Sequence, residues 1–157
     1  MAVKRHPVAV DIRGDALARV PLDTALVSRL RVTYDAVRVH ELRLAETFYA
    51  KLFDAAPHLR PMFPGDLRAQ AAKLTAALDV VVRNFEDPAA NVSLLSDLGR
   101  RHAGYGVQPE HYAIVVDLLI ASMRELGGKA VSEAQLQEWR WALRLLSQQM
   151  IAAATAQ

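Results

Sequence analysis

The residue with the clearest chemical potential is His102, which ends a predicted helix beside a turn marked by glycine and proline. Gly104 and Gly106 suit a helix end and a left-handed turn because they lack a Cβ. Pro109 suits the first position of the next helix, where its missing N–H is not needed. An imidazole in this place stands on a rigid helix near an opening. It can ligate a metal there, although a lone histidine at a helix end more often interacts with the helix dipole.

The remaining histidines lie in settings that favour contact with solvent. They are found near the N-terminus, among charged residues, beside a proline turn and in the first turn of a helix: His6, His40, His58 and His111. The chain has no cysteine, so disulfides, thiolate metal sites and cysteine nucleophiles are excluded. His102 is therefore the candidate metal ligand.

Composition places the chain among ordinary globular proteins. It has 157 residues, 52% hydrophobic and 23% charged, and this length can bury roughly two-thirds of the unfolded surface. The net charge of +2 and the short basic runs do not indicate a nucleic-acid surface. Pro7 and Asp11 interrupt any export signal, and no stretch reaches the ~20 apolar residues of a membrane span. We expect a cytoplasmic protein.

Two regions are expected. Residues 1–20 are punctuated by Pro7 and Gly14 and are predicted to be an N-terminal extension. Residues 21–157 are predicted to form a single all-α domain, because apolar residues recur there every three or four positions. Asp23 or Thr24 is the expected first N-cap, with a bend near His40.

Further helices are expected over four ranges: 67–85, 89–103, 109–126 and 133–154. Asp87-Pro88 is expected to stop the first of these, and Ser132 with Gln135 forms a capping box before the last. The first of these helices is expected to bury Gln70, Leu74 and Leu78. The inner faces of the last two are predicted to be Tyr112, Val115, Val116, Leu119 and Met123, then Leu136, Trp139, Leu143, Leu146 and Met150.

Four runs carry a family resemblance. They are residues 48–53 (FYAKLF), 57–63 (PHLRPMF), 99–102 (GRRH) and 108–112 (QPEHY). In this order they resemble bacterial globins of the flavohaemoglobin and single-domain haemoglobin type, and the likeness extends from about residue 21 to residue 154. It implies a globin fold, a three-on-three helical sandwich around a pocket for haem b.

The resemblance implies a role for each matched residue. His102 corresponds to the proximal histidine that binds the haem iron, and its second ring N–H then needs an acceptor. The carbonyl oxygen of Leu98, one turn back, is in reach if the helix is regular. Tyr49, Gln70 and Leu74 correspond to the distal ligand-binding positions. The residues expected at the haem itself are Phe63, Leu74, Lys73, Arg101, Val107 and Tyr112, with Phe63 against the porphyrin and Tyr112 beside the proximal histidine.

On the residues alone, Tyr49 and Phe63 are best explained as core aromatics. Gln70 and Leu74 lie one turn apart on one helix face, and an amide buried there would lack a partner. The Tyr49 hydroxyl and the Gln70 amide are candidate donors to a bound diatomic ligand. They would slow its release, because fixed dipoles in a dry pocket are little screened.

Two departures from the family bear on function. Flavohaemoglobins continue into a flavin- and nicotinamide-binding reductase, whereas this chain ends at Gln157, so we expect any electrons to come from a separate reductase. Ala154 replaces a glutamate that joins the family's proximal histidine, which argues against a strong peroxidase. Lys73, Arg100 and Arg101 either pair with haem propionates or remain solvated.

The sequence predicts a globin that binds O2, CO and NO reversibly, for oxygen storage, delivery or scavenging. The first alternative is a nitric oxide dioxygenase that works with a separate reductase in the same pocket. The second is a haem-free sensor or interaction module with a globin shape, against which His102 and Gln70 argue. Residues 1–20 are expected to provide a partner contact or a lid over the haem edge.

Overall fold

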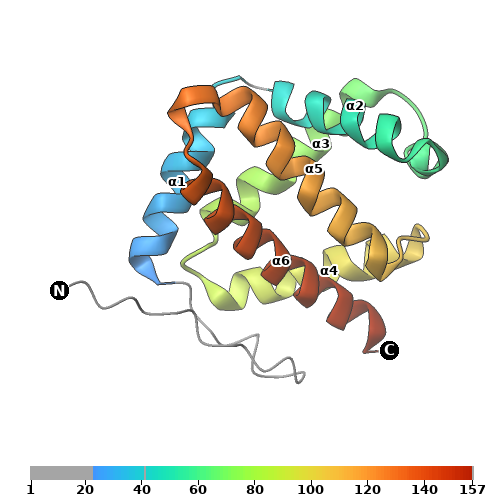
Figure 1. The fold of residues 1–157 in the computed structure, drawn as a ribbon. Coiled ribbons are helices and arrows are strands. Elements are labelled where there is room, and N and C mark those ends of the chain that lie inside the picture. Colours follow the sequence, from blue (N-terminus) through green and yellow to red (C-terminus); the bar gives the residue numbers. More distant parts are fainter. Residues whose placement is uncertain (1–22, 41, 157) are drawn as a thin grey trace.

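The structure is a computed structural model that describes residues 23–40 and 42–156, so the predicted extension over residues 1–20 lies outside the described residues. Every regular element in this part of the chain is a helix, which confirms the all-α prediction (Figure 1). The elements are α1 (Thr24–Arg38), α2 (Arg43–Ala55), η2 (Pro57–Met62), α3 (Leu67–Arg83), α4 (Pro88–Gly104), α5 (Pro109–Gly127), η3 (Gly128–Ala130) and α6 (Glu133–Thr155).

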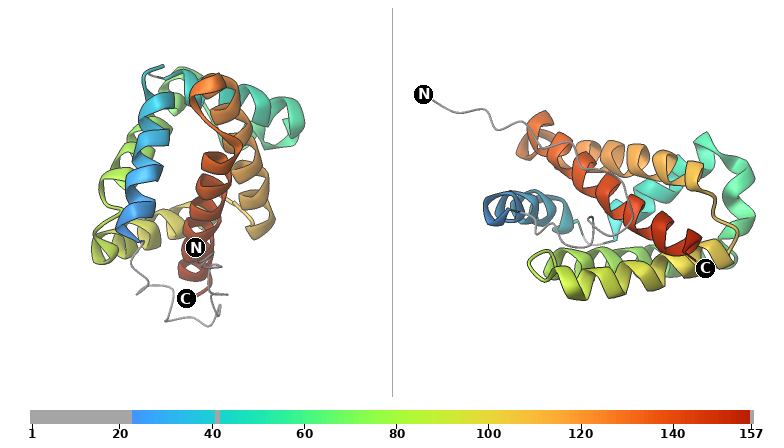
Figure 2. Two further views of the ribbon diagram at one scale, coloured as in Figure 1. Left: turned by 60° about the vertical axis from the view of Figure 1, so that its left-hand side comes forward. Right: turned by 90° about the horizontal axis from the view of Figure 1, so that it is seen from below.

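The helices pack in two layers. α4 packs against α6, α2 packs against α3 and α5, and α1 packs against α5 and α6. The view from below in Figure 2 shows α5 and α6 on one side and α3 and α4 on the other. None of the described helices combines the length and the apolar stretch that a membrane crossing requires.

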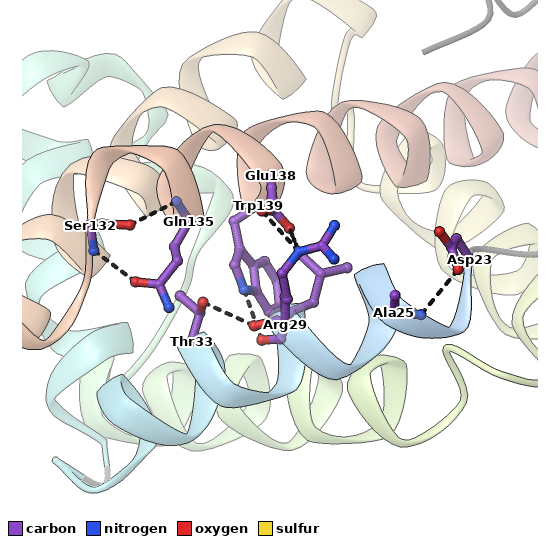
Figure 3. Close-up of polar contacts among 9 residues, drawn as sticks. Asp23, Ala25, Arg29, Thr33, Ser132, Gln135, Glu138 and Trp139 are labelled. Atoms are coloured by element: carbon purple, nitrogen blue, oxygen red, sulfur yellow. Dashed lines mark hydrogen bonds and ion pairs between the residues drawn. The ribbon is translucent and has the colours of Figure 1, made fainter. Parts of the chain in front are cut away.

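Short-range capping rules place several helix ends correctly. The Asp23 carboxylate accepts from the Ala25 N–H at 3.1 Å and begins α1. The capping box before α6 is formed reciprocally: Ser132 N–H donates to Gln135 Oε1 at 2.8 Å, and Gln135 N–H donates to Ser132 Oγ at 3.2 Å (Figure 3). These bonds satisfy N–H groups that a helix start leaves without a partner.

The boundary between α3 and α4 differs from the prediction. α3 ends at Arg83 rather than residue 85, and Phe85 turns into the core, where it is 2% exposed. Asp87 and Pro88 do not stop α3 but begin α4. The Asp87 carboxylate accepts from the Ala90 N–H at 3.0 Å, and proline occupies the first turn. An Asp-Pro pair can end one helix or begin the next. Here the packing of Phe85 in the core favours the second role.

Trp139 joins α1 to α6 at the centre of the core. Its indole N–H donates to the Leu30 carbonyl oxygen at 3.0 Å, and its ring lies 5.8 Å from Tyr34 and 5.9 Å from Phe85 between centroids. The ion pair between Arg29 and Glu138, at 3.0 Å, lies on the same pair of helices (Figure 3). An indole buried with its N–H satisfied stabilises the contact without leaving a polar group unpaired.

A close approach of two backbones sets the crossing of α4 and α6. A Cβ on Gly99 would overlap the carbonyl oxygen of Met150 and lie 2.8 Å from its carbonyl carbon. Only glycine fits there, because the obstacle is backbone rather than a flexible side chain. The crossing lies one turn before the end of α4, so it also fixes the helix end that carries His102.

Gly99→Ala is therefore expected to lower the free energy of unfolding by about 1–3 kcal/mol, because α4 must move away from α6. Gly104→Ala is the matched control, since a Cβ at Gly104 meets no atom within 4 Å. That variant is expected to be neutral or stabilising by up to ~1 kcal/mol through helix propensity. Urea unfolding measures both, and equal stability of the two variants would contradict the argument.

Candidate functional site

His102 is held by one well-defined hydrogen bond. It lies half-buried in the last turn of α4, and its Nδ1 is 2.7 Å from the carbonyl oxygen of Leu98. This bond confirms the contact expected from a regular helix. A carbonyl oxygen can only accept, so Nδ1 carries the proton and Nε2 of the neutral ring keeps a lone pair. No hydrogen bond to Nε2 occurs in the part of the chain that the structure describes, which leaves this nitrogen able to ligate.

The chain leaves α4 through a Schellman turn. Gly106 has a φ of 90°, its N–H donates to the Ala103 carbonyl oxygen at 3.0 Å, and the Val107 N–H donates to the His102 carbonyl oxygen at 3.0 Å. The left-handed glycine of the predicted turn is thus Gly106, whereas Gly104 is the last helical residue. The turn fixes the backbone of His102 from its C-terminal side.

The start of α5 uses a residue that the sequence interpretation placed in solvent. His111 is half-buried, and its Nδ1 accepts from the Gln108 N–H at 3.0 Å. The bond lies at the surface, so the expected surface setting of His111 holds, but its role as the helix cap was not predicted. The available signal was its position three residues after Gln108, where a side-chain acceptor can reach back to the first residue of a helix.

Tyr112 lies beside His102, as the resemblance implied. The two ring centroids are 6.2 Å apart and the ring planes meet at 31°. Burial raises the pKa of Tyr112. The Schellman turn and the His111 cap together set the distance between these two rings, which lie on different helices.

Tyr49, from α2, lies in a cluster of aromatic rings. It stacks on Phe53 with centroids 5.9 Å apart and meets the edge of Phe63 at 5.3 Å. The residue is 6% exposed, and burial raises the pKa of its hydroxyl to about 12. No hydrogen bond to that hydroxyl occurs within the described residues. A buried phenol that remains protonated is a donor available to a bound group.

The predicted inner face of α3 packs on the core but is not its most buried side near the start of the helix. The buried residues of α3 are Ala71, Thr75, Val81 and Val82, whereas Gln70, Leu74 and Leu78 are half-buried. The amide of Gln70 therefore stands at the boundary of the core rather than inside it. The spacing of apolar residues predicts the buried face of a helix only to within about one residue position. The packing of α3 against α2 buries the side that carries Ala71.

Several apolar side chains pack on the core yet stay partly exposed. They come from the turn before α3 and from α3, α4, α5 and α6: Phe63, Leu74, Leu78, Leu94, Val115, Leu118 and Leu146. Val107 in the turn after α4 is half-buried as well. Apolar surface of this kind costs free energy in water, so these residues suit contact with a large apolar cofactor.

The charged candidates lie at the surface. Arg100 pairs with Asp97 at 2.5 Å, whereas Lys73 and Arg101 are exposed and form no ion pair within the described part of the chain. Ala154 is half-buried near the end of α6. The C-terminal ends of α4 and α6 lie on the same side of the molecule (Figure 1).

The fold and the site together define a two-layered helical protein that presents one histidine at the end of a helix. Residues 46–150, more than half of the chain, match the family model described as Globin. The chain belongs to the globin family. Its relatives include flavohaemoproteins from Chromobacterium violaceum, 31% identical over 79% of this chain, and from Rhizobium meliloti, 29% identical over 70% of it. The chain matches 31% and 28% of these two proteins, so it spans about a third of their length.

Similar solved structures include two bacterial proteins. One is an engineered carbene transferase, a variant of a Rhodothermus marinus protein assigned as a nitric oxide dioxygenase. It is 28% identical, has a TM-score of 0.71, and the match covers 80% of this chain and 88% of that one. The other is a bacterial globin from Campylobacter jejuni, 22% identical with a TM-score of 0.72, where the match covers 84% and 96% of the two chains. The second likeness shows the fold alone.

The Tyr49 hydroxyl is expected to stay protonated until about pH 12. Because the phenolate forms more readily in the unfolded chain, Tyr49 should make stability fall as the pH rises from 10.0 towards about 12. Ultraviolet titration of the wild type and of Tyr49→Phe measures the difference. A Tyr49 titration close to pH 10.0 would contradict the buried position of this ring.

Proposed function

We propose that this chain binds haem b through Nε2 of His102 and uses it to bind O2, CO and NO reversibly. The observation that carries the proposal is the hydrogen bond from His102 Nδ1 to the Leu98 carbonyl oxygen, at 2.7 Å. It fixes both the tautomer and the orientation of the ring and leaves Nε2 for the iron. The half-buried apolar side chains of α3, α4, α5 and α6 support the same proposal, since apolar surface of this kind suits contact with a porphyrin.

Each candidate residue has a defined part in holding the cofactor. Phe63, Leu74, Val107 and Tyr112 supply apolar or aromatic contacts. The exposed cations Lys73 and Arg101 are the candidates to pair with the haem propionates. When bound, haem supplies a ferrous iron at which O2, CO and NO attach reversibly.

The distal residues of this chain control how long a ligand stays. The Tyr49 hydroxyl and the Gln70 amide donate hydrogen bonds to the ligand, while Leu74 keeps water away from it. Burial strengthens these bonds because the surrounding dielectric is low. The half-exposed position of Gln70 makes Tyr49 the stronger of the two donors.

The proximal residues favour binding over oxidative chemistry. His102 donates to a peptide oxygen, and Ala154 supplies no carboxylate at the end of α6. A peptide acceptor gives the imidazole less anionic character than a carboxylate would, and therefore less push towards O–O cleavage.

Nitric oxide dioxygenation is the second candidate, favoured by the likeness to the Rhodothermus marinus protein. It uses the same distal donors and needs electrons from a reductase. Turnover of nitric oxide with an added reductase distinguishes it from simple reversible binding.

The first test is the visible spectrum of the purified protein after reconstitution with hemin. We expect a Soret band that shifts on reduction and again with CO, and we expect His102→Ala to lose most of the bound haem. His58→Ala is the control, because that histidine is exposed in η2, away from α4 and α5. If the wild type took up no haem, the haem proposal would be refuted and the alternative of a globin-shaped interaction module would be favoured.

Tyr49→Phe is expected to speed O2 release by roughly 10- to 100-fold, because a hydrogen bond to a charged acceptor contributes about 1.5–3 kcal/mol. Tyr105→Phe is the matched control, since Tyr105 is 71% exposed at the end of α4. Stopped-flow displacement of O2 by CO measures both rates. Equal rates in the wild type and Tyr49→Phe would remove Tyr49 from the distal role.

A further inference from the structure

Arg60 makes several contacts that the sequence interpretation did not anticipate. It lies half-buried in η2, and its guanidinium donates to the carbonyl oxygen of Phe63 and, at 3.2 Å, to that of Gly65. Two peptide oxygens from one turn thus share a planar fork of donors, which suits arginine and not lysine. The side chain closes the turn that joins η2 to α3.

The same guanidinium covers part of the aromatic cluster. Its Cζ lies 5.3 Å from the centroid of the Phe53 ring, and Phe53 in turn meets Phe63 at 5.5 Å and Tyr49 at 5.9 Å. A cation over an aromatic face is attracted by the negative potential of the ring. Arg60 therefore holds the Phe63 backbone and the neighbouring Phe53 ring at once.

The closed turn also sets where α3 begins. Gly65 adopts a φ of 90°, and Asp66 follows it as the N-cap, accepting from the Arg68 N–H at 3.0 Å. The Gln70 N–H donates to the Asp66 carbonyl oxygen at 3.2 Å. The position of Gln70 thus depends on the path of the turn that Arg60 closes.

We propose that Arg60 is a positioning residue for the distal side, which fixes Phe63 and Gln70 relative to Tyr49 and so governs how long a diatomic ligand is retained. This role rests on the proposed haem function. It acts through the turn and the aromatic cluster, without contact between Arg60 and the ligand. Both guanidinium bonds are made to backbone oxygens, so they hold the path of the turn directly.

The test uses the full chain with three variants. Arg60→Met keeps the apolar stem and loses both hydrogen bonds and the charge, while Arg60→Lys keeps the charge and loses the fork. Arg144→Met is the control, because Arg144 is exposed on α6. The readouts are amide exchange over residues 63–70, the rate of O2 release and the infrared C–O stretching band of the CO form.

Arg60→Met is expected to speed exchange over residues 63–70 by about tenfold and O2 release by roughly three- to tenfold, the scale of one or two lost hydrogen bonds. The C–O band should broaden, since the distal donors no longer hold one arrangement. The exchange and O2-release rates of Arg60→Lys should lie between those of Arg60→Met and the wild type. Arg60→Lys also provides the test if Arg60→Met does not fold. Arg144→Met should match the wild type.

Two results overturn the proposal, and they differ from failure of the haem function. Unchanged exchange over residues 63–70 in Arg60→Met would show that the guanidinium does not hold the turn. Faster amide exchange over residues 63–70, with unchanged O2 release and an unchanged C–O band, would show that the guanidinium holds the turn but does not affect ligand retention. A wild type that takes up no haem would instead refute the proposed function, and with it any distal role for Arg60.

Discussion

The position of the histidine depends on the contact between the backbones of α4 and α6. Gly99 lets the two helices cross at the carbonyl oxygen of Met150, where a side chain would force them apart. The last turn of α4 is therefore held on one side by α6, and the Schellman turn at Gly106 holds it on the other. A ligand residue on a helix end that is fixed from both sides needs little reorganisation to bind a cofactor, which is why rigid elements make precise sites.

The two sides of the site are built in different ways. On the side of His102, hydrogen bonds to the backbone orient two rings: Leu98 holds His102, and Gln108 holds His111, which precedes Tyr112. On the side of Tyr49, packing orients the ring of this residue, while its hydroxyl makes no hydrogen bond among the described residues. A fixed imidazole suits a permanent bond, whereas a protonated hydroxyl on a buried ring suits a ligand that comes and goes.

Arg60 links these features to the fold. By holding the turn between η2 and α3, it connects the aromatic cluster around Tyr49 to the helix that carries Gln70. The turn contains a left-handed glycine and few apolar anchors, so the backbone alone defines its path weakly. A charged fork bonded to two peptide oxygens supplies the missing constraint.

The sequence by itself determined the features that rules acting within a few residues control. These are the caps at Asp23 and Ser132, the left-handed turn at Gly106 and the bond from His102 to Leu98, because each partner lies within five positions. Only the tertiary structure decided that Ala71 rather than Gln70 faces the core, and that Phe85 enters the core and frees Asp87 to begin α4. The spacing of apolar residues in the sequence defines an apolar stripe on a helix. Which residues of that stripe are buried depends on where the neighbouring helices lie.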